Sequence, residues 1–199
     1  MTRIVGGTWV GRRLATPSGE TTRPTSEKVR AALASSLYST GGLVGARVLD
    51  LYAGSGALGL ELVSRGASSA VFVERDRAAL AALRENIATL GSGGGGPGGG
   101  LTVLHGDVAA VIGRLGDPVA QTGAIGPFDV VVADPPYDLE GEALLGVLTG
   151  LSSAGVLAAH ADLIVERSVK SGAPSWPAPL EGVRSRRYGD TLLCYGRAP

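Results

Sequence analysis

From residue 47 onward, short apolar runs alternate with segments whose apolar residues recur at helical spacing. The runs predict strands at residues 47–53, 70–76, 101–107, 128–136 and 161–169. The segments with helical spacing predict helices at residues 57–66, 77–91, 108–116 and 142–151. Residues 183–198 predict two more strands, joined at Tyr188-Gly189-Asp190. Alternating strands and helices predict an α/β fold, in which a mostly parallel sheet is covered on both faces and a C-terminal hairpin adds antiparallel strands.

The N-terminal pattern is different. Residues 1–23 mix alternating positions with turn residues and predict a small β-hairpin that turns at Gly6-Gly7. Residues 24–38 then predict a helix that Thr25 or Ser26 caps. We therefore expect two parts, an N-terminal extension at residues 1–23 and a main domain at residues 24–199. The glycine-rich residues 91–100 supply no side chains for packing and predict a flexible connection.

Length and composition narrow the class of protein. The chain has 199 residues, of which 44% are hydrophobic, and this suits one moderate domain with its own core. A single cysteine rules out internal disulfides and cysteine-based zinc sites, and the two histidines form no motif. No apolar stretch reaches the length of a membrane span, and the N-terminus has no secretory pattern. We expect a cytoplasmic, metal-free protein.

Charge is unevenly distributed along this formally neutral chain. Residues 1–30 carry six basic side chains against two acidic ones, a net charge of +4, and the remainder therefore carries −4. A basic N-terminus on an otherwise acidic body fits a polyanionic partner, although a solvated surface explains the charge equally well.

A glycine loop follows the first strand of the α/β part. Gly54, Gly56 and Gly59 fit the spacing G-x-G-x-x-G, and Glu74 lies 20 residues beyond Gly54, at the end of the next strand. Glycines let a backbone approach a ligand closely, and an acid in this place accepts hydrogen bonds from ribose hydroxyls. The pattern favours a nucleoside ligand over a simple strand-to-helix turn.

Two further acids discriminate between nucleoside ligands. Asp50 precedes the loop, where it would repel a pyrophosphate but can pair with the ammonium of S-adenosylmethionine. Asp107 ends the third strand, where a carboxylate can accept from an adenine amino group. Because ligands of open α/β sheets bind at the carboxyl ends of the strands, we expect Asp50, Glu74 and Asp107 to face one S-adenosylmethionine site.

The fourth strand runs into "DPPY" at residues 134–137. Prolines end a strand ladder, but a stop requires neither the acid before them nor the tyrosine after them. With the glycine loop, this motif resembles class I S-adenosylmethionine-dependent methyltransferases that methylate exocyclic amines of nucleic-acid bases. The resemblance implies that Asp134 and the Pro135 carbonyl accept from the target amine, that Pro136 makes the turn rigid, and that Tyr137 stacks on the base.

A more specific similarity covers nearly the whole chain. The segments "RIVGGTWVGRRLATP", "TRPTSEKVRAAL", "LDLYAGSGALGLELVSRGA" and "VVVADPPY" resemble the RsmD family of bacterial small-subunit ribosomal RNA guanine-N2 methyltransferases. The resemblance implies a Rossmann-like sheet of seven strands with a small N-terminal hairpin and helix extension. It also implies a monomer that methylates a guanine of 16S ribosomal RNA in the assembled or assembling small subunit. The glycine tract departs from the family pattern.

The candidate site residues follow from these assignments. We expect catalysis from Asp134, Pro135, Pro136 and Tyr137. We expect contacts to S-adenosylmethionine, or to its product S-adenosylhomocysteine, from Asp50, Tyr52, Ala53, Gly54, Gly56, Glu74, Arg75, Asp107, Val108 and Asp134. We expect RNA contacts from Arg3, Trp9, Arg12, Arg13, Arg23, Thr25, Arg184, Arg186 and Arg187. Packing of Trp9 on the body explains that residue equally well, and charge protection of an exposed strand edge is an alternative for the last three arginines.

Three other functions remain open at the level of sequence. An NAD-dependent oxidoreductase fits the glycine loop and Glu74 but leaves the motif at 134–137 unexplained. A non-catalytic RNA-binding assembly factor would not require that motif. An adenine-N6 or other nucleic-acid amine methyltransferase would share it, because the motif does not distinguish one amine from another.

Overall fold

The computed structural model describes residues 2–17, 26–91, 100–115 and 126–199. A seven-stranded sheet forms the centre, in the order β5-β4-β3-β6-β7-β9-β8. Five of its strands are mutually parallel: β3 (Arg47–Leu51), β4 (Ser69–Glu74), β5 (Leu101–His105), β6 (Phe128–Ala133) and β7 (Leu157–Ser168). Strands β8 (Glu181–Tyr188) and β9 (Thr191–Arg197) form a hairpin that turns at Gly189-Asp190, as the sequence predicts, and β9 pairs antiparallel with both β7 and β8.

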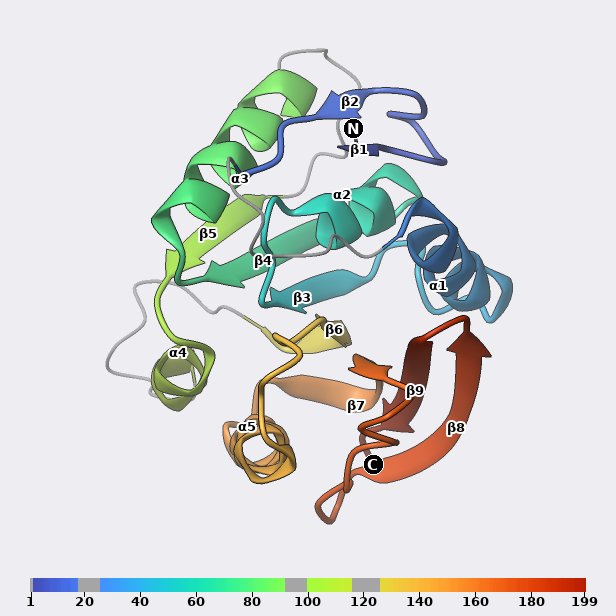
Figure 1. The fold of residues 1–199 in the computed structure, drawn as a ribbon, viewed down its shortest axis with the longest axis vertical. Coiled ribbons are helices and arrows are strands. Elements are labelled where there is room, and N and C mark those ends of the chain that lie inside the picture. Colours follow the sequence, from blue (N-terminus) through green and yellow to red (C-terminus); the bar gives the residue numbers. More distant parts are fainter. Residues whose placement is uncertain (1, 18–25, 92–99, 116–125) are drawn as a thin grey trace.

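Helices cover both faces of the sheet (Figure 1). On one face lie α1 (Glu27–Ser39), α2 (Ala57–Ser64) and α3 (Arg77–Gly91), and on the other α4 (Val108–Leu115) and α5 (Gly141–Ser153). Successive strand residues point to opposite faces, so Val48 joins the core under α1–α3 and Leu49 the core under α4 and α5. This double burial explains why the strands are continuous apolar runs.

Polar side chains fix where the helices begin. The hydroxyl of Ser26 accepts a hydrogen bond from the Val29 N–H and caps α1. Asp76 accepts from the Ala79 N–H at the start of α3, and Asp107 accepts from the Ala109 N–H at the start of α4. The alternative cap of α1, Thr25, lies outside the described residues.

The N-terminal extension contains a hairpin with a longer connection than expected. Strands β1 (Thr2–Arg3) and β2 (Arg13–Leu14) pair antiparallel, with Thr2 opposite Leu14. The connection is the whole segment 4–12, closed by hydrogen bonds from the Ile4 N–H to the Arg12 carbonyl and from the Gly11 N–H to the Ile4 carbonyl. The predicted hairpin is present, and Gly6-Gly7 lies within its connection, but the turn extends over the whole segment rather than over the two glycines alone. Gly7 has a φ of +81° and lies against the Ser64 carbonyl so closely that a Cβ would collide with it.

Strand order reverses next to β3. The chain runs outward from β3 to β4 and β5, then returns to place β6 on the other side of β3. Ligands of doubly wound sheets bind in the crevice that such a reversal leaves at the carboxyl ends of the strands. The reversal therefore brings the loops after β3 and β6, and with them the glycine loop and residues 134–137, next to each other.

Candidate active site

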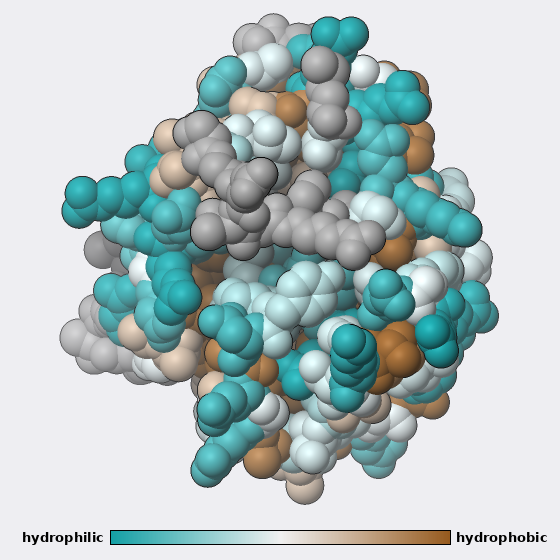
Figure 2. Space-filling view, in the orientation of Figure 1, coloured by the Kyte–Doolittle hydropathy of each residue, from teal (hydrophilic) through white to brown (hydrophobic). Residues whose placement is uncertain are grey.

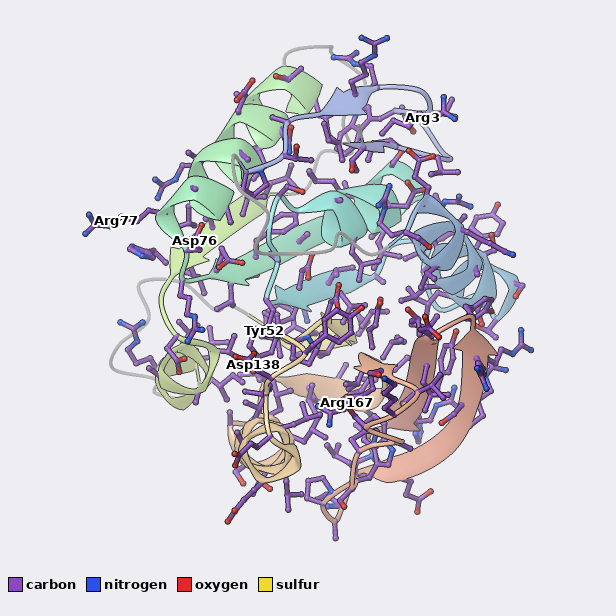
Figure 3. All side chains as sticks on the ribbon, viewed as in Figure 1. Arg3, Tyr52, Asp76, Arg77, Asp138 and Arg167 are labelled. Atoms are coloured by element: carbon purple, nitrogen blue, oxygen red, sulfur yellow. The ribbon has the colours of Figure 1, made fainter. Side chains whose placement is uncertain are left out.

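The ends of β3 and β6 meet at the carboxyl edge of the sheet. Leu51, the last residue of β3, pairs with Ala133, the last residue of β6, so Tyr52 and Asp134 begin two adjacent loops. In Figure 3, the labelled Tyr52 and Asp138 lie in the same part of the view, in front of these strand ends. The sequence prediction that the glycine loop and the DPPY motif share one site is therefore consistent with the sheet register.

The three glycines of the loop have different surroundings. A methyl group at Gly54, which has a φ of +57°, would meet no heavy atom of the described residues within 4 Å. At Gly56 (φ +78°) a methyl would collide with the Leu83 side chain of α3. At Gly59 it would lie 2.6 Å from Phe72 Cε1 and 2.8 Å from Asp50 Oδ2. Gly54 therefore leaves room for a ligand, whereas Gly56 and Gly59 let helices approach the loop and the sheet.

Glu74 holds the glycine loop from the neighbouring strand. Its Oε2 accepts a 2.7 Å hydrogen bond from the Gly54 N–H, and its Oε1 accepts from the Arg75 and Asp76 N–H groups at 2.8 Å. A carboxylate has about four acceptor positions, so room remains for a hydroxyl donor. Glu74 therefore fixes the position of Gly54 in the loop from the neighbouring strand.

Asp50 lies beneath the loop rather than at its surface. It is 2% exposed, and its Oδ2 accepts a 2.9 Å hydrogen bond from the Gly59 N–H. Burial raises the pKa of Asp50 to about 8, and the nearby charges of Asp134 and Glu74 add to this against the Gly59 hydrogen bond. The three carboxyl groups of Asp50, Glu74 and Asp134 are therefore close enough to repel one another, and a cation bound among them would reduce this repulsion.

A second group of candidates surrounds the start of α4. The Asp107 carboxylate has its Oδ2 3.9 Å from Arg75 Nη1, and both side chains are largely exposed. Tyr52 adopts a left-handed φ of 61°, unusual for a residue with a side chain. Burial raises the pKa of Tyr52 to about 12, with the Asp107 charge adding and the Arg75 charge opposing. Tyr52, Arg75 and Asp107 are thus neighbours, and Val108 is buried directly after Asp107.

The DPPY segment leaves β6 in a short turn. Pro135 is buried, Pro136 is exposed, and the Pro136 carbonyl accepts a 2.9 Å hydrogen bond from the Leu139 N–H. The Leu139 carbonyl accepts in turn from Arg167 Nη1 of β7 at 3.1 Å, so the neighbouring strand supports the turn. Tyr137 is 59% exposed, which leaves its ring accessible to a stacking partner.

The RNA-contact candidates fall into separate groups. Arg3, Arg12 and Arg13 are exposed on the N-terminal hairpin, where Arg12 Nη2 donates to the Thr89 carbonyl of α3 at 2.8 Å. Arg184, Arg186 and Arg187 are exposed on the edge strand β8, and the Arg184 guanidinium lies 4.5 Å from the centre of the Tyr195 ring. In Figure 1 the hairpin lies at the top and β8 at the lower right, and both contact α1: Arg30 of α1 donates to the Arg3 carbonyl at 2.9 Å, and Arg184 donates to Ser36 Oγ of α1 at 2.8 Å. Arg23 and Thr25 lie outside the described residues.

The prediction that Trp9 contacts RNA does not agree with its buried position. The residue is only 4% exposed and packs in the core with Ile4, Leu14 and the helices α1–α3. Its backbone N–H donates to Ser64 Oγ at 2.9 Å. The ring is therefore used for packing in this structure and is not presented to an RNA base, so the packing alternative is the better account of Trp9.

Sequence reasoning missed a set of buried polar residues that hold the extension. Glu61 Oε2 accepts from the Val5 N–H at 2.7 Å, and Arg30 donates to the Arg3 carbonyl at 2.9 Å. Ser64 and Asn86 bond the extension in the same way. The partners lie far apart in the sequence, so no local pattern reveals them, although an acid inside the apolar helix "ALGLELVS" is a signal.

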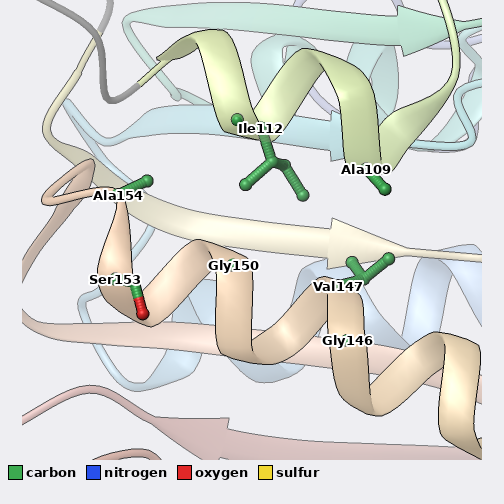
Figure 4. Close-up of a pocket in the computed structure, with 8 residues that line it drawn as sticks. Ala109, Ile112, Gly146, Val147, Gly150, Ser153 and Ala154 are labelled. Carbon is green, nitrogen blue, oxygen red and sulfur yellow. The ribbon is translucent and has the colours of Figure 1, made fainter.

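A groove runs between α4 and α5 (Figure 4). It measures about 440 Å³, and Ala109, Ile112, Val147 and Ser153 are among the residues that line it. Its lining contains no titratable side chain, so it offers no catalytic group. Within the described part of the chain, no group of three or more His, Cys, Asp and Glu is arranged to hold a metal ion, and no helix is long and apolar enough to span a membrane. The outer surface in Figure 2 is mostly hydrophilic, with scattered apolar patches.

Comparison with known proteins identifies the family. A family model described as "Conserved hypothetical protein 95" matches residues 2–197. The Escherichia coli K12 protein named Ribosomal RNA small subunit methyltransferase D is 37% identical over 176 residues, which are 88% of this chain and 79% of the relative. This chain belongs to the RsmD family. The resemblance expected from the N-terminal segments, the glycine loop and the DPPY motif is thereby confirmed.

A second relative and a solved structure agree. The Bacillus subtilis protein named "Putative rRNA methyltransferase YlbH" is 31% identical over 195 residues, which are 95% of both chains. The structure titled "Putative methyltransferase yhhF from Escherichia coli" superposes with a TM-score of 0.78 at 33% identity, over 98% of this chain and 96% of its own. The expected Rossmann-like class I methyltransferase fold, with its seven-stranded sheet and N-terminal hairpin, is confirmed.

Proposed function

We propose that this RsmD-family protein transfers a methyl group from S-adenosylmethionine to the exocyclic N2 amine of a guanine in 16S ribosomal RNA. The observation that carries the proposal is the placement of Asp134-Pro135-Pro136-Tyr137 at the end of β6, beside the glycine loop at the end of β3. The family's named relatives act on ribosomal RNA of the small subunit and support the substrate class.

The residues of the strand ends fit the proposed cofactor. A side chain at Gly54 would meet no described atom, so a ligand would fit there, and Glu74 beside it would accept a hydrogen bond from a ribose hydroxyl. Asp107, after β5, is available to an adenine amino group, and buried Asp50 favours a nearby cation. S-adenosylmethionine supplies an activated methyl group on a sulfonium, and these residues would bind and orient it.

The DPPY residues would activate the target amine by position. The lone pair of an aromatic amine is delocalised into the ring, which makes the nitrogen a poor nucleophile. Hydrogen bonds from its two N–H groups to the Asp134 carboxylate and the Pro135 carbonyl favour a pyramidal nitrogen with its lone pair directed at the methyl group. The buried Pro135 would keep the turn rigid, and the exposed Tyr137 ring would stack on the base.

Basic side chains outside the site would bind the RNA backbone. Arg3, Arg12 and Arg13 on the hairpin and Arg184, Arg186 and Arg187 on β8 are exposed and suited to phosphates. A single ribosomal RNA substrate would contact both groups. We propose that the enzyme acts as a cytoplasmic monomer.

The test is methyl transfer to a defined substrate. Small subunits that lack the family's modification are incubated with labelled S-adenosylmethionine, and the labelled nucleotide is mapped by digestion and mass spectrometry, with Asp134→Ala as the control. We expect one N2-methylguanine in 16S RNA with the wild-type protein, and far less of it with Asp134→Ala in the same reaction time. Label on adenine would replace guanine-N2 by adenine-N6 specificity. Affinity for NAD without S-adenosylmethionine binding would favour an oxidoreductase, and RNA binding without transfer a non-catalytic assembly factor.

A further inference from the structure

Asn86 of α3 is a buried polar residue that no step of the proposed reaction uses. It is 2% exposed, and its side chain contacts two segments that are far apart in the sequence. Its Oδ1 accepts a 2.7 Å hydrogen bond from the Ala15 N–H, and its Nδ2 donates to the Ala15 carbonyl at 3.0 Å and to the Ser55 carbonyl at 2.9 Å. Ala15 directly follows β2 of the N-terminal extension, and Ser55 lies between Gly54 and Gly56 of the glycine loop.

These hydrogen bonds engage both polar atoms of the Asn86 amide, and they fix its orientation. A primary amide has two N–H donors and one carbonyl acceptor, and here each donor meets a carbonyl while the acceptor meets an N–H. A flipped amide would face the Ala15 N–H with its own NH₂ group. The side chain is therefore held in one orientation between Ala15 and Ser55.

Helix α3 supports the loop at a neighbouring point as well. Leu83, one turn before Asn86, packs against Gly56 so closely that a Cβ at Gly56 would collide with it. Glu74 holds the Gly54 N–H from β4. The loop is thus fixed at Gly54 by Glu74, at Ser55 by Asn86 and at Gly56 by Leu83. Of these three supports, Asn86 is the one whose described hydrogen bonds also hold the extension.

We propose that Asn86 is a positioning residue that couples the N-terminal extension to the glycine loop, so that cofactor affinity depends on how Ala15 is docked. The proposal rests on the proposed function, because it takes the glycine loop as the cofactor site. Coupling between two sites is reciprocal. Bound cofactor therefore stabilises the docked extension, and RNA that engages the extension strengthens cofactor binding.

The chain offers a matched control at Ser64 of α2. Ser64 is also 2% exposed, and its hydroxyl also bonds the extension, by accepting from the Trp9 N–H at 2.9 Å and donating to the Gly6 carbonyl at 2.6 Å. None of the described hydrogen bonds of Ser64 reaches the glycine loop. Asn86→Ala and Ser64→Ala both loosen the extension, but only the first releases Ser55.

The experiment compares these variants in affinity for S-adenosylhomocysteine by calorimetry and in steady-state kinetics. We expect a similar fall in the melting temperature of both variants. Asn86→Ala should bind S-adenosylhomocysteine about 3- to 10-fold more weakly, the effect of removing one hydrogen bond of ordinary strength. Its KM for S-adenosylmethionine should rise by the same factor with little change in kcat, while Ser64→Ala stays within about twofold of wild type in both. Equal effects of the two variants, or none, would overturn the coupling.

A second measurement tests the coupling without any ligand. The Gly56 N–H donates to the Ala53 carbonyl and closes the loop, so its hydrogen exchange reports loop order. We expect faster exchange at Gly56 in Asn86→Ala than in Ser64→Ala, and unchanged exchange in both would refute the positioning role. If Asn86→Ala does not fold, Asn86→Asp replaces it, because it keeps the Oδ1 acceptor and loses both donors. If the variants differ in exchange at Gly56 but the wild type binds no S-adenosylhomocysteine, the proposed function fails and the coupling stands.

Discussion

Asp50 predicts that cofactor binding at the proposed site releases a proton, which can be measured. Its carboxyl group is buried under the glycine loop, and burial raises its pKa from 3.8 to about 8, with further upward contributions from Asp134 and Glu74. At pH 7 roughly nine tenths of the free protein therefore carries a neutral Asp50. A cofactor whose ammonium lies near Asp50 favours the ionised form and expels this proton.

The size of the effect follows from the charge separation. For an ammonium about 5 Å from the carboxylate and an effective dielectric constant of about 20, the attraction is about 3 kcal/mol, or roughly two pKa units. The bound-state pKa of Asp50 then lies near ~6, and binding at pH 7 releases about 0.8 proton. Apparent affinity should rise roughly tenfold between pH 6 and pH 7.5, because fewer protons remain to be removed. Above that range the cofactor's own amino group, with a pKa of about 7.7–8.0, loses its charge.

The assay is titration calorimetry with S-adenosylhomocysteine at pH 7 in buffers of different ionisation enthalpy. Wild type should release about 0.8 proton and Asp50→Asn close to none, with an affinity nearly independent of pH below 7.5. Asparagine keeps an oxygen acceptor for the Gly59 N–H, so the variant should fold. Tight binding by the wild type without proton release would show that the ammonium lies elsewhere. Stability gives a second check. The stabilising protonation of Asp50 is complete below pH 3.8 and is lost as the pH rises through about 8, so Asp50→Asn should remove this decline.

Three further predictions address the loop, the motif and the hairpin. Asp134→Ala should bind cofactor almost normally but transfer methyl about 10²–10³-fold more slowly in single turnover, and an unchanged rate would make the acid only a turn former. Gly54→Ala should lose about 1–2 kcal/mol of unfolding free energy in a denaturant titration and should bind S-adenosylhomocysteine poorly. Gly56→Ala should lose about 1–3 kcal/mol more, because its methyl group collides with α3, and equal losses in the two variants would contradict the packing role of Gly56. Reversing both charges in Arg12→Glu/Arg13→Glu should make the slope of log K for RNA binding against log salt concentration less steep, by about 0.7–0.9 for each phosphate that the variant no longer neutralises. An unaltered slope in a salt titration would show that the hairpin is not part of the RNA interface.

The fold can be predicted from the sequence because the apolar runs and helical spacings along the chain match the burial of the strands and helices in the structure. Strands buried on both faces must be apolar throughout, and the runs at 47–53 and 128–136 therefore predict β3 and β6. The predicted strand at 128–136 is too long at its end, because the prolines at 135 and 136 cannot donate to a ladder. Glycines and acids at the ends of strands predict the site, because parallel strands bring their carboxyl ends to one edge.

The extension is less predictable because its stability comes from distant partners. The hairpin strands contain two residues each, too few for an alternating pattern, and the chain follows the surface of α2 instead of turning at Gly6-Gly7 alone. Trp9 is the same residue type whether it stacks on RNA or fills a core, so sequence could not choose between them. Asn86 is an ordinary polar residue of α3 by its sequence, and only the fold brings Ala15 and Ser55 to it across 71 and 31 residues.

These contacts change how the role of the basic N-terminus has to be studied. Ile4, Trp9 and Leu14 belong to the core under α1–α3, and removal of a large buried side chain such as Trp9 costs about 3–5 kcal/mol. A deletion of the extension would also remove the hydrogen bonds that Glu61, Ser64 and Asn86 make with it, at about 0.5–1.5 kcal/mol each. Such a sum approaches the whole stability of a domain, about 5–15 kcal/mol. Loss of methylation after truncation would therefore report unfolding, whereas substitution of the exposed Arg13, which has no role in the core, separates RNA affinity from structure.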